Sequence, residues 1–351
     1  MKKILLSLVV TVGVTFFGNS KVLTVSNNPN SPGQYTELQA ACDAASKNDT
    51  IYIQGSESGY NGASIYKPLV LIGAGALPDK RFPFPTKIFG TLNFGYESGL
   101  KNANGSKIFG CDITYNIEIA ASNITIQRNR ITTVKIVGAS NVLIHNNIIT
   151  NVIYFGGSNV FVKNNCLSSI GGNPGAGNNW VIANNIILGQ ISAIHYAAIY
   201  NNIIVTTGGD ALSGTNYSSV SNNLFLGKKT FTEQDVIYGT NTGGNNIFNK
   251  DPEFVSMNSS IISYSYTNPA TGPFEDYHLK PESPAKGTGV NGADMGIYGG
   301  DNPFFEGTPN DGRFRYFPMP SIPIVTDLNI KDAAIQKGGS INIMFKARKQ
   351  D

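Results

Sequence analysis

The stretch N-V-L-I-H-N-N-I-I, from Asn141 to Ile149, returns as N-V-F-V-K-N-N-C-L from Asn159 to Leu167 and as N-W-V-I-A-N-N-I-I from Asn179 to Ile187. The second Asn of each pair belongs to a longer column with intervals of 18, 18, 20, 17, 21 and 23 residues: Asn129, Asn147, Asn165, Asn185, Asn202, Asn223 and Asn246. A repeat with a period near 20 and variable length is typical of a solenoid.

Two further columns of the repeat are almost wholly apolar. Three residues before the column Asn stand Ile126, Ile144, Val162, Ile182, Ile199 and Val220, and two residues after it stand Ile131, Ile149, Leu167, Ile187, Ile204, Phe225 and Phe248. Apolar and other residues alternate between these positions, which predicts short strands with one buried face. The Asn falls where the chain must turn sharply, and Asn tolerates a left-handed backbone while its amide bonds to neighbours. We therefore expect stacked amides to form a hydrogen-bonded ladder inside the turn.

One such coil cannot bury its apolar face alone, whereas coils stacked in parallel at roughly 4.8 Å share one continuous core. The pattern predicts an all-β protein, a right-handed parallel β-helix of roughly ten coils. The main alternative is a β-sandwich, whose strands would be separated by hairpin turn signals and would not repeat one Asn column.

The composition agrees with a turn-rich solenoid. The 351 residues include 39 glycines, and 14% of them are charged, against about 25% in an average soluble domain. We expect one long β domain, residues 21–318. The formal net charge of +3 gives no strong field for nucleic acid or a membrane surface, so no nucleic-acid partner is expected.

The N-terminus has the layout of a secretory signal peptide, assigned to residues 1–20. Met1-Lys2-Lys3 precede an apolar run from Ile4 to Phe17, which is too short for a membrane span, and small residues follow. We therefore expect a secreted, extracellular or cell-surface protein of bacterial type, with no transmembrane segment after the signal is removed. The alternative is a buried first strand.

The cysteines and histidines give no site pattern. Cys42, Cys111 and Cys166 are an odd number without paired spacing, so they are expected to be buried small hydrophobes. The three histidines have no metal-ligand spacing. No metal site and no cofactor is predicted.

Both ends of the repeat carry capping signals. Tyr35 to Ile53 shows helical spacing followed by a strand, with Thr36 and Gln39 as a predicted capping box, and this helix would plug the first coil. Residues 319–351 contain two alternating runs, Ile324 to Ile330 and Ser340 to Phe345. They predict a small hairpin that covers the edge of the last coil; the alternative is a secretion or surface-sorting tail.

Several of these segments resemble a known superfamily. D-T-I-Y-I at 49–53 and L-V-L-I-G-A-G at 69–75 are similar to the start of pectin-lyase-like right-handed β-helix proteins. The sequences D-P-E-F at 251–254, D-Y-H-L-K-P-E-S-P-A-K-G-T-G at 276–289 and G-A-D-M-G-I-Y-G-G at 292–300 resemble the closing segments of secreted bacterial members. The resemblance covers about residues 22–318 and implies the fold, without an activity.

The acidic residues argue against catalysis. Polysaccharide lyases usually use a calcium site built from carboxylates together with a basic residue, and hydrolases need two or three carboxylates. Between Glu118 and Asp210 the chain has no Asp or Glu, and the polygalacturonase-type signatures are absent. No catalytic residue is therefore assigned. If a centre exists, its first candidates are three acids with Lys163 or His195: Asp210, Glu233 and Asp235.

The same stretch offers a candidate binding face. It contains four cations without counter-charges in the stretch: Arg128, Arg130, Lys135 and Lys163. Gln127, His145 and Lys163 share one column of the repeat, while Thr125, Leu143 and Phe161 share the column beside it. Stacked on one sheet, these columns would form a weakly basic stripe beside an apolar one, able to bind an anionic or neutral glycan. The alternative is that they are ordinary outward residues of a solenoid; Trp180 is read as core.

The predicted binding residues are therefore His145, Phe161 and Lys163. The sequence favours a secreted or surface β-helix that is non-catalytic and either binds polysaccharide or has a structural or interaction role. A polysaccharide lyase or glycoside hydrolase with an atypical site is the alternative, and the oligomeric state stays open.

Overall fold

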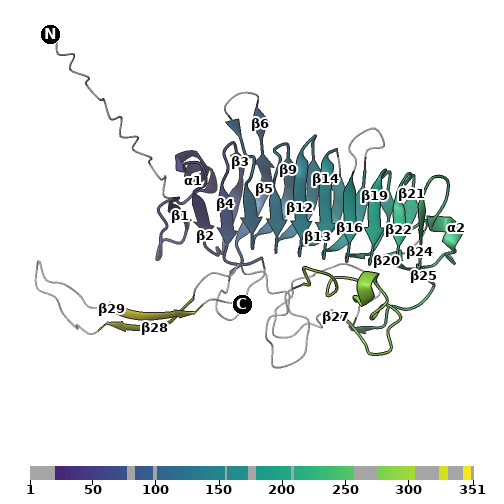
Figure 1. Ribbon diagram of the computed structural model, residues 1–351. Helices are drawn as coiled ribbons and strands as arrows, with labels where there is room; N and C mark the ends of the chain where they lie inside the picture. Colours follow the sequence, from purple (N-terminus) through teal and green to yellow (C-terminus); the bar gives the residue numbers. More distant parts are fainter. Residues whose placement is uncertain are drawn as a thin grey trace, which may run out of the picture.

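The computed structural model describes residues 20–76, 84–97, 101–154, 156–172, 179–206, 209–256, 276–304, 324–330 and 343–348. It confirms an all-β parallel β-helix (Figure 1). The predicted signal peptide, residues 1–20, lies outside the described residues except for Ser20. Within the described part of the chain, no helix is long and apolar enough to cross a membrane.

Two long parallel sheets form the walls of the solenoid. The first sheet has eleven strands, in the order β1 (Val22–Val25), β2 (Thr50–Ile53), β4 (Val70–Gly73), β8 (Lys107–Phe109), β10 (Thr125–Gln127), β12 (Ser140–His145), β14 (Ser158–Lys163), β16 (Trp180–Ala183), β19 (Ala197–Tyr200), β22 (Ser219–Ser221) and β24 (Thr242–Gly244). The second sheet has twelve: β25 (Ile247–Phe248), β23 (Leu224–Gly227), β20 (Ile203–Thr206), β17 (Ile186–Ile187), β15 (Cys166–Gly171), β13 (Ile148–Tyr154), β11 (Arg130–Ile136), β9 (Asp112–Ile119), β5 (Lys87–Phe94) and β3 (Tyr60–Ile65), with β18 (Ile191–Ser192) and β21 (Leu212–Ser213) off this path. Each coil contributes to both sheets, so every repeat column becomes a row along the axis.

The predicted inward columns fill the core between the sheets. All six residues of the first column, Ile126 to Val220, are at most 1% exposed, and those of the second from Ile131 to Phe225 are fully buried. Trp180 is 2% exposed and its indole Nε1 donates to the Gly157 carbonyl at 2.7 Å. The three cysteines are buried and free, as expected.

The asparagine ladder is confirmed and runs without a break from Asn129 to Asn246. The Asn165 Nδ2 donates to the carbonyls of Ile144 and Lys163 at 2.9 Å and to the Asn185 Oδ1 at 3.1 Å. Its own Oδ1 accepts the backbone N–H of Asn147 at 2.9 Å and the Asn147 amide at 3.0 Å. The ladder thus satisfies main-chain groups that lie inside the turn, where water cannot reach them.

The left-handed backbone predicted for the ladder residue belongs instead to the residue before it. Asn146, Asn164, Asn184, Asn201 and Asn222 have φ between 51° and 56°. The first Asn of each pair therefore makes the turn, while the second forms the ladder. Dividing the two tasks explains why the pair repeats and not a single Asn.

Cys111 occupies the ladder position one coil before Asn129. Its backbone N–H donates to the Asn129 Oδ1 at 2.9 Å, and its thiol contacts the Phe109 carbonyl at 3.4 Å, as an Asn amide does in later coils. Burial raises the pKa of this thiol above its usual range. Cys111 thus continues the ladder column toward the N-terminal coils, with a thiol where later coils have an amide.

Helices lie at both ends of the solenoid. At the N-terminal end, α1 (Leu38–Ala44) buries Leu38, Ala41 and Cys42 against the first coils. The predicted capping box of Thr36 and Gln39 is wrong, because the helix starts after Glu37 without a side-chain cap. The Gln39 amide instead binds the backbone of Ser64 in β3, so it ties the helix to the second sheet. At the C-terminal end, the short α2 (Glu233–Val236) buries Val236 in the same core.

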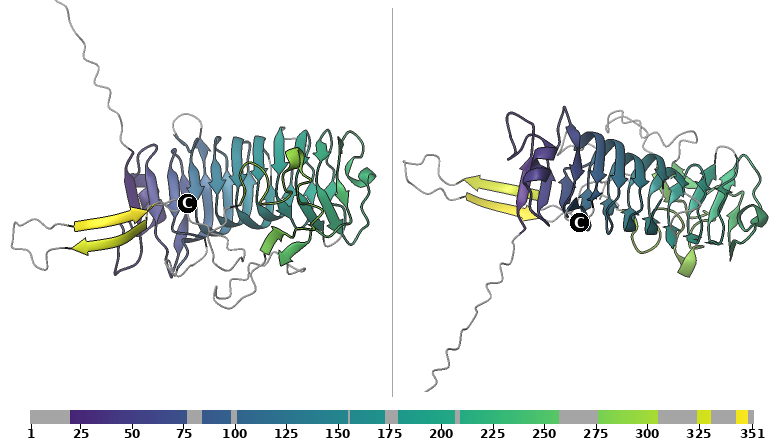
Figure 2. Two further views of the ribbon diagram at one scale, coloured as in Figure 1. Left: turned by 60° about the horizontal axis from the view of Figure 1, so that its bottom comes forward. Right: turned by 90° about the horizontal axis from the view of Figure 1, so that it is seen from above.

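A closing segment, residues 276–304, runs back along the outside of the coils (Figure 2). It begins with β27 (Asp276–Leu279), which pairs with β26 (Phe254–Ser256), and contains the 3₁₀ turn η1 (Val290–Gly292). The first Asn of successive pairs binds it. In order, Asn222 binds Thr288, Asn201 binds Val290 and Gly296, Asn184 binds Asp294 and Gly296, Asn164 binds Ile297 and Gly299, and Asn146 binds Asn302 and Pro303.

Beneath this segment lies a second apolar cluster. It contains the residues that directly follow the ladder Asn, namely Ile148, Cys166, Ile186, Ile203 and Leu224. Met295, Ile297 and Phe304 of the closing segment pack against them. In the two preceding coils the same position holds Asp112 and Arg130, and there the column is polar.

The remaining strands form small antiparallel pairs. β6 (Tyr96–Glu97) pairs with β7 (Lys101–Asn102), and β28 (Ile324–Ile330) pairs with β29 (Ile343–Arg348), which confirms the C-terminal hairpin. Figures 1 and 2 draw this hairpin beyond the α1 end of the solenoid, whereas the last coils, β24 and β25, lie at the other end beside α2. The expected cover of the last coil is thus not this hairpin but the α2 segment.

We predict that Asn165→Ala and Asn147→Ala each lower the free energy of unfolding by about 1–3 kcal/mol, because each leaves buried backbone groups without partners. Urea denaturation measures the effect. Asn151→Ala, on the exposed outer surface with one 3.4 Å bond to Thr133, is the control and should change it by less than about 0.5 kcal/mol. Equal midpoints for all three variants would contradict the ladder's role.

We predict that Asn164→Gly loosens the closing segment without unfolding the coils. Glycine keeps the left-handed backbone, while two hydrogen bonds, to the Ile297 carbonyl at 2.9 Å and the Gly299 carbonyl at 2.8 Å, are lost. Hydrogen exchange should quicken for the amides of residues 296–304. Asn159→Gly, at a residue with φ 52° and no bond to this segment, is the control; equal exchange in both variants would show that the outward amides do not hold it.

Candidate functional site

The predicted columns lie side by side on the outer face of the first sheet. Leu143 pairs with Phe161, and His145 pairs with Lys163, in the register of β12 and β14. Thr125 and Gln127 of β10 extend the same two rows by one coil. The position of the three predicted residues on one face is thus as expected from the repeat.

Phe161 and Lys163 form the accessible centre of this face. Both are partly exposed, and the Lys163 Nζ lies 5.7 Å from the centroid of the Phe161 ring, a cation–π distance. Among the described residues, no carboxylate lies within ion-pair distance of Lys163. An aromatic ring and an ammonium group on an open sheet can contact the apolar face of a sugar and one of its anionic or hydroxyl groups.

His145 differs from these two because it is only 9% exposed. Its Nδ1 lies 2.9 Å from the Asn146 Oδ1. Burial, with a smaller effect of the Arg128 and Lys163 charges, lowers the pKa of His145 to about 4, although the Asn146 bond opposes this. The imidazole is therefore neutral near pH 7 and offers little surface to a ligand.

Arg130 and Lys135, which the sequence predicted to lack counter-charges, do have them. The Arg130 guanidinium lies 3.6 Å from the Asp112 carboxylate, and the Lys135 Nζ lies 3.1 Å from Glu118. Both acids lie in β9, the strand that pairs with β11 in register. The prediction missed them because it counted charges along the chain, while the partners come from the preceding coil.

Two of the three candidate catalytic acids, Asp210 and Asp235, form an ion-pair cluster with Lys229. The Lys229 Nζ binds Asp210 Oδ1 at 2.7 Å and Asp235 Oδ1 at 2.6 Å. Hydrogen bonds from Lys229 and Thr232 lower the pKa of Asp235 to about 2, so it is not a proton donor near neutral pH. Glu233 is exposed on α2, and no described contact joins these acids to Lys163 or His195.

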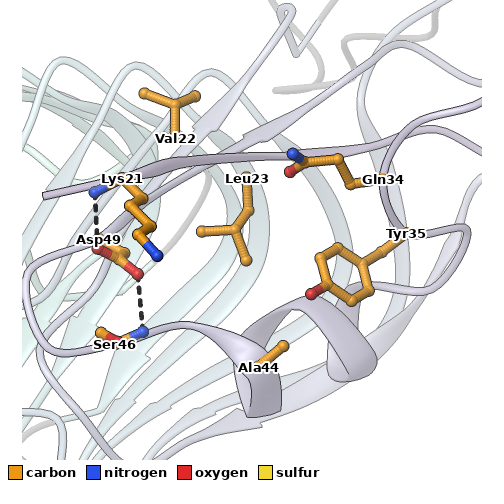
Figure 3. A pocket seen from close by; sticks show the side chains of 8 residues that line it. All are labelled: Lys21, Val22, Leu23, Gln34, Tyr35, Ala44, Ser46 and Asp49. Atoms are coloured by element: carbon orange, nitrogen blue, oxygen red, sulfur yellow. Dashed lines mark hydrogen bonds between the residues drawn. The ribbon is translucent and has the colours of Figure 1, made fainter.

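A cavity of about 450 Å³ lies at the other end of the molecule, between β1 and α1 (Figure 3). Its carboxylate, Asp49, accepts the backbone N–H groups of Lys21 and Ser46, both at 2.7 Å. This carboxylate joins the residue before β1 to the loop that follows α1, and both of its oxygens accept backbone N–H groups. Across the described residues, no three His, Cys, Asp or Glu side chains gather closely enough to hold a metal ion.

The first sheet's margin carries two residues that the sequence reasoning missed. Tyr196 and Tyr217 stand six residues before the ladder positions Asn202 and Asn223, at a position occupied by Asn in the four preceding coils. Aligning the coils on the ladder column would have shown the change from Asn to Tyr.

Comparison with known proteins adds no family to this description. The chain matches no protein-family model and no curated protein. The fold and the surface residues are therefore the basis for the function proposed below.

We predict that the stability of the protein falls between about pH 6.5 and pH 4 in a way that depends on His145. Its folded-state pKa is below the unfolded value, so the unfolded chain takes up the proton first as the pH falls. The loss is on the order of 3 kcal/mol across this range.

His145→Gln, which copies Gln127 of the neighbouring coil, should lack this part of the pH dependence. Urea denaturation of both proteins between pH 4 and pH 7.5 measures it. Parallel curves for the two proteins would contradict the burial of a neutral imidazole.

Proposed function

We propose that this protein is a secreted or cell-surface β-helix of the pectin-lyase-like type that binds polysaccharide without cleaving it. The observation that carries the proposal is the pairing of Phe161 and Lys163 on the open face of the first sheet. The ladder and the core use the inward residues of each coil, so these two side chains are left for a ligand.

The surroundings of this pair favour a glycan over other partners. The central strands of the first sheet, β10 to β19, contain no acidic residue. An anionic or neutral sugar chain would meet no repulsion there, and a flat sheet with a partly exposed ring suits the apolar face of a pyranose. A formal charge of +3 is too small to support binding to nucleic acid.

The charge pairing supports a binding role over catalysis. Asp210 and Asp235 share Lys229, while Arg130 and Lys135 are paired with the acids of β9. A lyase needs a free base beside a carboxylate-neutralising group, and a hydrolase needs a protonated acid. The ion pairs of Asp210, Asp235, Arg130 and Lys135 therefore support binding over cleavage.

We predict that the mature protein is retained on at least one acidic or neutral polysaccharide, with or without calcium, and releases no product. A polysaccharide array measures retention, and assays for 4,5-unsaturated and reducing ends measure cleavage. Phe161→Leu copies Leu143 and Lys163→Gln copies Gln127, so both replacements already fit their columns. Each should weaken binding by about three- to tenfold, which corresponds to about 0.6–1.4 kcal/mol.

The controls separate the two classes of function. Asn151→Ala changes an exposed residue of the second sheet and should bind like the wild type. Released products would establish an enzyme and direct mutation to Asp210, Glu233 and Asp235. Wild-type binding by both face variants would place the binding surface elsewhere.

A further inference from the structure

The margin of the first sheet carries a second row of side chains along the axis. Six residues before each ladder position, the backbone is left-handed in six consecutive coils. These residues and their φ angles are Asn123 (59°), Asn141 (57°), Asn159 (52°), Asn179 (66°), Tyr196 (55°) and Tyr217 (53°). The position therefore imposes a conformation that few residues adopt readily.

Asparagine suits this position and tyrosine does not. Asn141 and Asn159 each donate their amide to the Asn one coil earlier, at 3.2 Å, so the left-handed turn is supported by an exposed ladder. A bulky side chain has no such compensation, and a left-handed residue of this kind is an outlier. Strained residues of this kind gather at functional sites.

The two tyrosines are also turned toward solvent. Tyr196 is 49% exposed and Tyr217 is 55% exposed, so core packing does not explain them. Their rings are stacked, with centroids 4.9 Å apart and planes 8° from parallel. His195 lies edge-on to both at 6.5 Å. In the part of the chain that the structure describes, neither phenol hydroxyl makes a hydrogen bond and neither tyrosine contacts a charged group.

The tyrosine pair lies on the same side of the solenoid as Phe161. In the sheet register Phe161 pairs with Val181, which pairs with Ala198, two residues after Tyr196. Two coil spacings separate them along the axis, or about 10 Å. A polysaccharide lying along the axis could therefore contact Phe161 and the tyrosine rings with different sugar units.

We propose that Tyr196 and Tyr217 form a second sugar subsite, which takes an uncharged pyranose unit. The proposal rests on the proposed function. Aromatic rings bind the apolar C–H face of a sugar, and the two phenol hydroxyls are available to its hydroxyl groups. Lys163 lies over the Phe161 ring, whereas among the described residues no Lys or Arg lies over either tyrosine ring, so this subsite does not favour a uronate.

The test is a double variant that removes both rings and places, at each position, a residue that adopts the left-handed backbone more readily than tyrosine. Tyr196→Asn combined with Tyr217→Asn restores the residue that the earlier coils use, so its unfolding midpoint should equal or exceed that of the wild type. In native affinity gels containing galactomannan or xyloglucan, it should bind at least about tenfold more weakly. In gels containing polygalacturonate, the loss should be smaller.

Two controls make the comparison specific. Tyr115→Asn removes a tyrosine that is 60% exposed on β9 of the second sheet and should bind like the wild type. In the wild type, saturating galactomannan should protect Tyr196 and Tyr217 from nitration by tetranitromethane and leave Tyr115 reactive. This second measurement does not depend on the folding of a variant.

The outcomes distinguish this proposal from the broader one. Full binding by the double variant, together with weakened binding by Phe161→Leu, would overturn the tyrosine subsite and leave the sheet face as the binding surface. Equal nitration with and without galactomannan would overturn it as well. A wild-type protein that no polysaccharide in the gels retards would overturn both proposals.

Discussion

The buried asparagine ladder is the interaction on which the rest of the structure depends. Each turn between the two sheets encloses backbone N–H and carbonyl groups that cannot reach water, and an unpaired group there costs about 1–3 kcal/mol. One amide per coil satisfies them and also bonds to the amide of the next coil, as Asn185 does to Asn202 at 3.0 Å. The ladder therefore ties neighbouring coils together in one register. Because the register is kept, residues at one repeat position form a continuous row.

The first Asn of each pair makes a second set of hydrogen bonds, on the outside of the turn. The second Asn points inward, while the left-handed backbone of the first sends its amide outward to the closing segment. That segment covers the apolar row from Ile148 to Leu224, which would otherwise face solvent. In the two earlier coils this row holds Asp112 and Arg130, which form an ion pair, so the row is polar there.

Features that repeat with the coil could be predicted from the sequence, and features that join distant segments could not. The ladder, the inward columns and the buried Trp180 all follow from position within one repeat. The bonds from the outward asparagines cross 66 to 157 residues to a segment without a repeat, so periodicity carries no sign of them. The Asp112–Arg130 pair was missed because its partners are adjacent only after the coils stack. The prediction of a capping box at the start of α1 was wrong because the Gln39 amide binds the backbone of Ser64 in β3.

On the first sheet, a residue can be compared with what its row in the repeat requires. Phe161 and Lys163 occupy rows where the fold accepts Thr, Leu, Gln or Ala, so the scaffold alone does not explain their identity. Tyr196 and Tyr217 are a stronger case, because their row demands a left-handed backbone that Asn adopts at lower cost. A residue that opposes the local backbone preference, lies half exposed and adds little to the core is not explained by folding. The contacts that the structure shows for these rings are with each other and with His195, on the solvent side of the sheet.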